Sequence, residues 1–237
     1  MNDTFLSAKW ENLIMANYAV EAAVLTPYLP KGVELDYYND KAYVSLVGFM
    51  FKETSLFNIP IPFFGTFEEI NLRFYVKRKE GARVKRGVVF INETVPFKAV
   101  AWLANKLYKE HYITIPTKNS IDIAGTRQVK YEWKIDNHWN HLKVDAALDT
   151  EKMKRGSMEE FIFEHYYGYT KINPLVSQEY QINHPRWLIN KVLNSSVHCN
   201  FKAMYGDAFA GLNEARPDSV FIAEGSPVTV KWKRTSF

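Results

Sequence analysis

The sequence predicts an α+β fold: a mostly antiparallel β-barrel or half-barrel with helices packed outside it. Two observations lead to this prediction. The chain of 237 residues contains 16 Phe, 14 Tyr and 6 Trp, and aromatic residues favour pleated sheets. Several apolar or alternating runs also have the length of strands and are bounded by turn residues. Because no Ser/Gly-rich linker, repeat or low-complexity segment interrupts the chain, we expect residues 1–237 to form a single domain.

The first part of the chain is predicted to contain two short helices. In residues 7–16, Trp10, Leu13 and Ile14 recur at helical spacing. A second helix is expected over residues 20–28, because the Pro and Gly of the following Leu-Pro-Lys-Gly run are typical of a turn. These helices would precede the sheet.

A strand, a loop and two further helices are predicted in the middle of the chain. Residues 42–52 are apolar on both faces, which is typical of a central strand. Residues 55–65 contain two prolines among apolar residues, so we expect a loop without strand pairing that folds over a core or covers a pocket. Residues 96–109 have one apolar face and begin with a proline, which suits a first helical turn. A capping box starts a helix over residues 157–166.

The remaining elements follow the same periodicities. Residues 129–135 alternate as an amphipathic strand and are expected to pair with residues 141–148. The last expected elements are strands near residues 180–184 and 228–233 and a short helix near residues 201–210.

The strand predicted over residues 67–76 has unusual chemistry on one face. Its sequence is FEEINLRFYV. Side chains alternate across a strand, so the apolar residues share one face. The other face presents a carboxylate, an amide, a guanidinium and a phenol, and it consists of Glu69, Asn71, Arg73 and Tyr75.

A second strand follows and adds two more polar candidates. Residues 87–95 are predicted to form this strand, which brings Glu93 close to the start of the helix that contains Lys98. If both strands belong to one curled sheet, we expect four side chains to converge inside it, namely Glu69, Arg73, Glu93 and Lys98. The pattern therefore predicts a polar pocket.

Two interpretations of this polar face remain open. Arg73 suits a carboxylate ligand because its guanidinium donates two parallel hydrogen bonds. Alternatively, Glu69 and Arg73 form an internal ion pair that sets strand register. His165 belongs to the apolar stripe of the helix predicted over residues 157–166, where it is either a satisfied core histidine or a further ligand-binding residue. For Lys98, a solvated lysine on the first helical turn is the ordinary interpretation.

Composition excludes several classes of function. The net charge of +4 and the scattered basic residues do not predict nucleic-acid binding. The single Cys199 excludes an intramolecular disulfide, and no histidine spacing suggests a metal site. The N-terminal sequence does not resemble a signal peptide and no run suits a membrane span, so we expect a cytoplasmic protein that does not associate with a membrane. We expect no cofactor and a small-molecule partner, and the sequence leaves a homo-oligomer open.

Several short motifs, taken in order, resemble the YqjF-like family of bacterial proteins, a domain of unknown function. The similarity runs from about Trp10 to the C-terminus. The motifs are Leu-Pro-Lys-Gly at 29–32, Ala-Tyr-Val-Ser-Leu-Val-Gly-Phe at 42–49, Glu-Ile-Asn-Leu-Arg at 69–73 with Tyr75 and Val76, Tyr-Lys-Glu-His-Tyr at 108–112, Glu164 and His165 with Tyr169 and Thr170, and His-Pro-Arg-Trp at 184–187. The family is similar in fold to acetoacetate decarboxylase, so the resemblance implies a cone-shaped, largely antiparallel barrel.

The resemblance to acetoacetate decarboxylase also implies a candidate for its Schiff-base lysine. Acetoacetate decarboxylase forms a Schiff base on a lysine within a Glu…Pro-Lys-Lys segment. The matching run here begins at Glu93 and ends with Pro-Phe-Lys at Lys98, so the resemblance implies Glu93 and Lys98 as candidate catalytic residues. Lys98 lacks the adjacent lysine that lowers the pKa of such an amine. Only burial and the helix N-terminus remain to lower it.

Three functions are therefore compared. The favoured one is binding of a small anionic or carbonyl-containing ligand in a polar barrel cavity. The first alternative is a cofactor-independent lyase that uses a Schiff base on Lys98. The second alternative is a structural or interaction module without a ligand, which predicts a cavity below the ~300 Å³ of typical ligand sites.

Overall fold

The computed structural model describes residues 4–237, including all side chains in this range except those of Tyr108 and Lys233. The strands are β1 (Thr4–Val20), β2 (Glu34–Leu35), β3 (Ala42–Leu56), β4 (Ile59–Pro60), β5 (Phe67–Glu80), β6 (Arg83–Val95), β7 (Tyr112–Thr114), β8 (Thr117–Ala124), β9 (Thr126–Ile135), β10 (His138–Lys152), β11 (Tyr167–Asn173), β12 (Val176–Asn183), β13 (Leu188–His198) and β14 (Ser219–Ser236). The helices are α1 (Ala22–Leu25), α2 (Lys98–Tyr108), α3 (Met158–Phe163) and α4 (Phe201–Tyr205), with 3-10 turns η1 (Thr26–Tyr28) and η2 (Asp207–Asn213).

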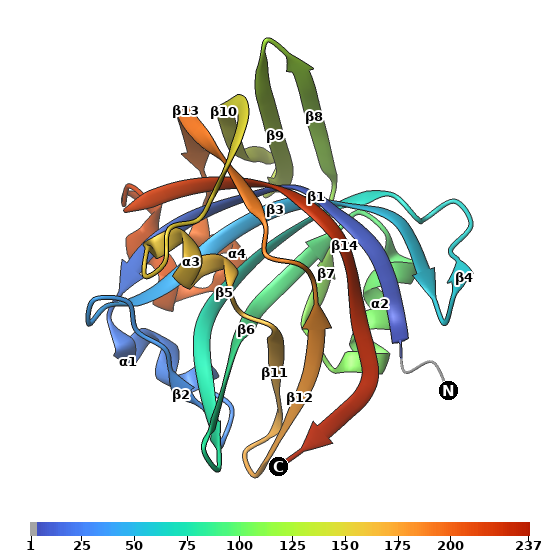
Figure 1. Ribbon diagram of the computed structural model, residues 1–237, viewed down its shortest axis with the longest axis vertical. Coiled ribbons are helices and arrows are strands. Elements are labelled where there is room, and N and C mark those ends of the chain that lie inside the picture. Colours follow the sequence, from blue (N-terminus) through green and yellow to red (C-terminus); the bar gives the residue numbers. More distant parts are fainter. Residues whose placement is uncertain (1–3) are drawn as a thin grey trace.

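The strands form one sheet that closes partly into a ring, which confirms the predicted α+β barrel or half-barrel. The ring runs in the order β1-β3-β5-β6-β11-β12-β14, and β14 pairs back with β1. Most pairs are antiparallel, whereas β6 pairs in parallel with both β7 and β11. From β14 the sheet continues through β13, β10, β9 and β8, and the β8–β9 hairpin projects from the top of the molecule in Figure 1.

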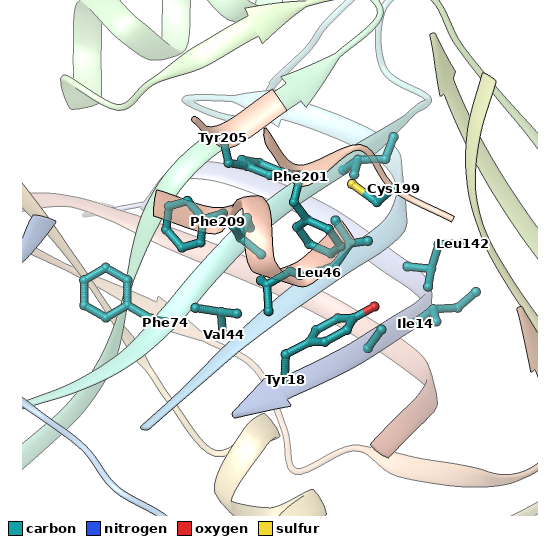
Figure 2. Packing of buried hydrophobic residues seen from close by; sticks show 14 of the residues in the cluster. Ile14, Tyr18, Val44, Leu46, Phe74, Leu142, Cys199, Phe201, Tyr205 and Phe209 are labelled. Carbon is teal, nitrogen blue, oxygen red and sulfur yellow. The ribbon is translucent and has the colours of Figure 1, made fainter. Parts of the chain in front are cut away.

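The two faces of β5 differ as the alternation predicts. Ile70, Leu72 and Phe74 are fully buried in an apolar cluster that also includes α4, β9 and β10 residues. Figure 2 shows Phe74 in the same cluster as Phe201 and Phe209. Burial of such side chains from water is the main stabilisation of a sheet of this kind. The odd-numbered residues of β5 consequently face the other side of the sheet.

The helix expected over residues 7–16 is wrong, because this segment lies within β1. Asn12 has a positive φ of 53°, and the β1–β3 register shifts between Glu11 and Ile14. A bulge of this kind inserts an extra residue and changes the alternation of side chains. Trp10 and Leu13 therefore reach the same face of the strand, a spacing that imitates the period of a helix.

Other boundaries also differ from those expected. The segment predicted as helix over residues 20–28 forms only α1 and η1. The loop over residues 55–65 does pair once, where β4 lies against the end of β3. Helix α2 begins at Lys98 rather than at Pro96, with Phe97 as its N-cap residue. Strands β8, β11 and β13 were not expected.

Several predictions are confirmed. The predicted strand over residues 42–52 lies within β3, and β9 pairs with β10 as expected. Helix α3 begins at the predicted capping box, since the Ser157 side chain accepts a hydrogen bond from the Glu160 backbone. It ends at Phe163 rather than at residue 166, so His165 lies beyond the helix. Within residues 4–237, no helix combines the length and apolar character needed to cross a membrane.

Candidate functional site

A cavity lies between the ring of strands and helix α2. It has a volume of about 200 Å³, which is below the ~300 Å³ lower end of typical ligand sites. A cavity of this size is what the alternative of a module without a ligand predicts, and any ligand that it holds must be a very small metabolite. Its walls are mainly apolar and come from β1, β3, the segment after β3, β5, β6 and α2. Representative lining residues are Trp10, Phe49, Phe64, Phe90 and Leu103.

One part of the cavity wall is polar. Glu69, Asn71 and Arg73 project from successive layers of β5, and Glu93 projects from the neighbouring β6. Asn71 pairs directly with Glu93 across the two strands. The structure thus brings four of the predicted site residues around one space. Glu110, Tyr112 and Tyr180 complete the polar lining.

Glu69 is held by two hydrogen bonds at this wall. Asn71 Nδ2 donates to Glu69 Oε1 at 2.9 Å, and the Tyr112 hydroxyl donates to Glu69 Oε2 at 3.1 Å. Glu69 is only 3% exposed. Each of its oxygens therefore accepts a bond that favours a carboxylate, while burial favours the neutral acid.

Three buried carboxyl groups share this region, and burial raises the pKa of each. The pKa of Glu69 is raised to about 7, where the bonds from Asn71 and Tyr112 oppose the effect of burial. The pKa of Glu110 is also raised to about 7 by burial, against the bonds from Thr170 and Tyr180. Burial and the proximity of Glu110 and Glu69 raise the pKa of Glu93 well above its ordinary range. At neutral pH the wall therefore holds carboxyl protons, so it can donate as well as accept.

Arg73 is the cation of this wall. Its Nη2 donates to the Ile162 carbonyl at 3.2 Å and contacts Met15 Sδ at 3.4 Å. Among the ion pairs of residues 4–237, none joins Arg73 to Glu69 or Glu93. The alternative of a Glu–Arg pair that sets strand register therefore lacks its central contact.

Five buried polar atoms of cavity-lining residues lack a hydrogen-bond partner within the described chain. Two of them, Trp10 Nε1 and Thr54 Oγ1, lie elsewhere in the lining. The three on the polar wall are Asn71 Oδ1, Arg73 Nε and Glu93 Oε2. Asn71 and Glu93 are only 2% and 3% exposed. Buried polar groups are normally paired, and an unpaired one costs about 1–3 kcal/mol. The three atoms offer an acceptor, a donor and a carboxyl oxygen to a molecule in the cavity.

The structure places Lys98 outside the cavity. Lys98 is exposed at the first residue of α2, whereas its neighbours Ala99 and Val100 line the cavity. No lysine lines the cavity among the side chains that the structure describes. The solvated interpretation of Lys98 therefore agrees with the structure, and a Schiff base inside the cavity would require another arrangement of this segment.

Tyr75 and His165 lie together but do not line the cavity. The Tyr75 hydroxyl bonds Ser45 Oγ at 2.5 Å, and its ring centroid lies 4.8 Å from that of His165. His165 Nε2 lies 3.4 Å from Asp36 Oδ2. Burial lowers the pKa of His165 to about 4, although Asp36 opposes the effect. Both residues are therefore buried, and His165 is neutral at pH 7.

Sequence reasoning missed Glu110 and Tyr112 as site residues. Both belong to a short segment that returns from the end of α2 to the edge of β6. Asn105 fixes this segment, because its side chain bonds both the N–H and the carbonyl of Tyr112. The motif at residues 108–112 was the available signal. Its Glu and Tyr could not be assigned to the pocket because β7 is too short to be recognised from periodicity.

The described residues contain no group of three or more His, Cys, Asp or Glu side chains that could hold a metal ion. The environment of the three glutamates at the cavity suits hydrogen bonding and proton transfer.

Comparisons with known proteins support the fold. The chain is 26% identical over 186 residues to the uncharacterized protein YqjF of Bacillus subtilis (strain 168), which covers 76% of this chain and 73% of that protein. An acetoacetate decarboxylase-like enzyme from Sphingomonas wittichii RW1 superposes with a TM-score of 0.65 at 10% identity, covering 100% of this chain and 94% of that one. An acetoacetate decarboxylase from Legionella pneumophila gives 0.63 at 11% identity, covering 100% and 90%.

A further structure is similar to the same extent. The enduracididine biosynthesis enzyme MppR, complexed with pyruvate, has a TM-score of 0.64 at 10% identity, covering 100% of this chain and 91% of that one. At such identities the similarity establishes a shared fold. The family model described as an uncharacterized conserved protein matches residues 7–227. The chain therefore belongs to this family, DUF2071, to which its sequence motifs and its fold both point.

Proposed function

We propose that the protein binds a small carbonyl-containing acid, with its apolar part against the aromatic walls and its oxygen atoms against the polar wall. The observation that supports the proposal is the group of unpartnered atoms on the polar wall of the cavity, namely Asn71 Oδ1, Arg73 Nε and Glu93 Oε2. A carbonyl or carboxylate oxygen accepts from Arg73 and from the protonated Glu93 carboxyl. MppR, a protein of similar fold, has been solved in complex with pyruvate, which supports this choice of ligand class.

The cavity also suggests a preference among such acids. Most of its lining is apolar, and its volume is about 200 Å³. Each buried methylene contributes about 0.8 kcal/mol. We therefore expect 2-oxohexanoate, with its short alkyl chain, to bind more tightly than pyruvate.

The test is ligand-induced thermal stabilisation, with affinities from titration calorimetry. Both probes are expected to raise the melting temperature of the wild-type protein, because ligand binding to the folded state alone stabilises it. Arg73→Ala is expected to remove this stabilisation. Arg86→Ala is the matched control, since Arg86 lies on β6, bonds Asp36 and does not line the cavity.

A second variant keeps the test decisive if Arg73→Ala does not fold. Ala104 lines the cavity from α2, so Ala104→Leu fills part of the space and should abolish binding. If neither probe stabilises the wild-type protein, or if Ala104→Leu binds both as well as the wild type, the proposal is wrong.

The runner-up function is a lyase that forms a Schiff base on Lys98. Borohydride trapping with acetoacetate, followed by mass mapping, distinguishes it from binding alone. An adduct at Lys98 that disappears in Lys98→Ala would favour the lyase. We expect no adduct, because Lys98 is exposed outside the cavity.

A further inference from the structure

A chain of hydrogen-bonding groups crosses the polar wall of the cavity. The Tyr112 hydroxyl donates its one proton to Glu69 Oε2. It also interacts with the Glu93 carboxyl, which lies beside it in the parallel β6–β7 pair. Burial and the neighbouring carboxyl groups raise the pKa of Glu93, and its Oε2 has no partner within the described chain. A proton on Glu93 therefore stays available to a molecule in the cavity, while Glu69 accepts a hydrogen bond at each of its two oxygens.

The environments of the two carboxyl groups support the same assignment. Glu69 also accepts from Asn71 Nδ2, so both of its oxygens are bonded as a carboxylate requires. Glu93 lacks a comparable second donor, and its Oε2 is unpartnered at the cavity. A pair of carboxyl groups whose surroundings favour opposite protonation states is typical of a general base and a general acid.

The acidic cluster is connected to the cavity by an independent feature. Asn71 is only 2% exposed and lines the cavity, and its Oδ1 has no hydrogen-bond partner within the described chain. Arg73 Nε is likewise buried, unpartnered and at the cavity. A carbonyl oxygen placed between Arg73 and Glu93 would meet two donors, and this arrangement stabilises negative charge on that oxygen.

We propose that the cavity catalyses reversible enolisation of a small carbonyl compound, with Glu69 as the base, Glu93 as the acid and Arg73 as the electrostatic stabiliser. This proposal rests on the binding function proposed above. A Glu69 carboxylate oxygen takes a proton from the carbon next to the carbonyl. The electron pair of that C–H bond forms a C=C bond, and the carbonyl oxygen takes the proton of Glu93. The reverse steps restore the ketone, so no oxidant, reductant or co-reactant is consumed.

The test is exchange of carbon-bound hydrogen for deuterium in D₂O, followed by proton NMR of pyruvate and 2-oxohexanoate. The wild-type protein is expected to accelerate loss of the signal from the hydrogens beside the carbonyl. Glu69→Gln and Glu93→Gln are each expected to slow the catalysed exchange by about 10²-fold or more, which is the usual contribution of a positioned acid or base.

Glu68→Gln is the matched control. Glu68 is a buried carboxyl on the same strand, but it bonds Thr117 and Asn119 and does not line the cavity. Its variant should keep the exchange rate within about twofold. The expected pH profile rises as Glu69 loses its proton near pH 7 and falls when Glu93 ionises at higher pH. The charged and titratable groups that face Glu69 are Arg73, Glu93, Glu110 and Tyr112.

The outcomes separate the two proposals. If the probes stabilise the wild-type protein but exchange is no faster than in buffer, enolisation is refuted and binding stands. If neither probe binds and neither loses its carbon-bound hydrogens faster than in buffer, both proposals fail. Exchange that survives in both glutamine variants but disappears in Lys98→Ala would also refute the proposal, because it would assign the chemistry to an imine.

Discussion

Glu110→Gln should make the protein less sensitive to alkaline pH. Glu110 Oε1 accepts from Thr170 Oγ1 at 2.6 Å and from the Tyr180 hydroxyl at 2.9 Å. The amide oxygen of glutamine can accept both bonds, so the substitution removes the titratable group and keeps these contacts. Glu110 is 7% exposed.

The magnitude follows from the pKa of the group. Burial raises the pKa of Glu110 from 4.5 to about 7 in the folded protein. Between these two values the unfolded chain releases its proton while the folded protein keeps it, so folding stability falls as the pH rises. The loss is complete above the folded pKa and amounts to about 3 kcal/mol for a shift of this size. Between pH 4.5 and pH 8, the free energy of unfolding of Glu110→Gln should therefore fall by about 3 kcal/mol less than that of the wild type.

Urea unfolding of the wild type and the variant at pH 4.5, 6, 7 and 8 measures the effect. Thr170→Val provides a control of opposite sign. The Thr170 bond lowers the pKa of Glu110, so its removal should steepen the loss of stability with pH. If Glu110→Gln and the wild type lose the same free energy between pH 4.5 and pH 8, Glu110 is not held neutral by burial and the reasoning fails.

Three further predictions concern other parts of the molecule. Burial keeps His165 neutral, with a pKa of about 4, so its ring proton signals in NMR should titrate only well below pH 6. Folding stability should fall by about 3 kcal/mol as the pH drops from about 6.5 to 4. An NMR titration midpoint near pH 6.5 would contradict this prediction. Gly87→Ala should lower the free energy of unfolding by about 1–3 kcal/mol in urea unfolding, because the added Cβ would overlap the Tyr167 carbonyl in the parallel β6–β11 pair. An unchanged urea midpoint would contradict this and show that the backbone at this junction relaxes easily. Phe63→Ser should change stability by no more than about 0.5 kcal/mol, because Phe63 is 96% exposed, and a larger loss would mean that this side chain is covered in solution.

Much of the fold could be predicted because its strands repeat with a period of two. The alternation along β5 separates Ile70, Leu72 and Phe74 from Glu69 and Arg73, and the structure keeps that separation. This information is local, since adjacent side chains of any strand point to opposite faces. The same locality explains the error in β1, where the bulge at Asn12 changes the alternation and places Trp10 and Leu13 on one face.

The sequence by itself determined which residues form the polar face of β5 and that Glu93 follows on a neighbouring strand. Only the tertiary structure decided which of these groups meet. It brought Glu110 and Tyr112 to the cavity through the short return from α2, and it left Lys98 in solvent although its sequence context resembles that of a catalytic lysine. The physical reason is that the orientation of a side chain within one strand depends on backbone geometry alone. Which other residues surround that side chain depends on long-range strand pairing, and the local periodicity of the sequence carries no information about such pairing.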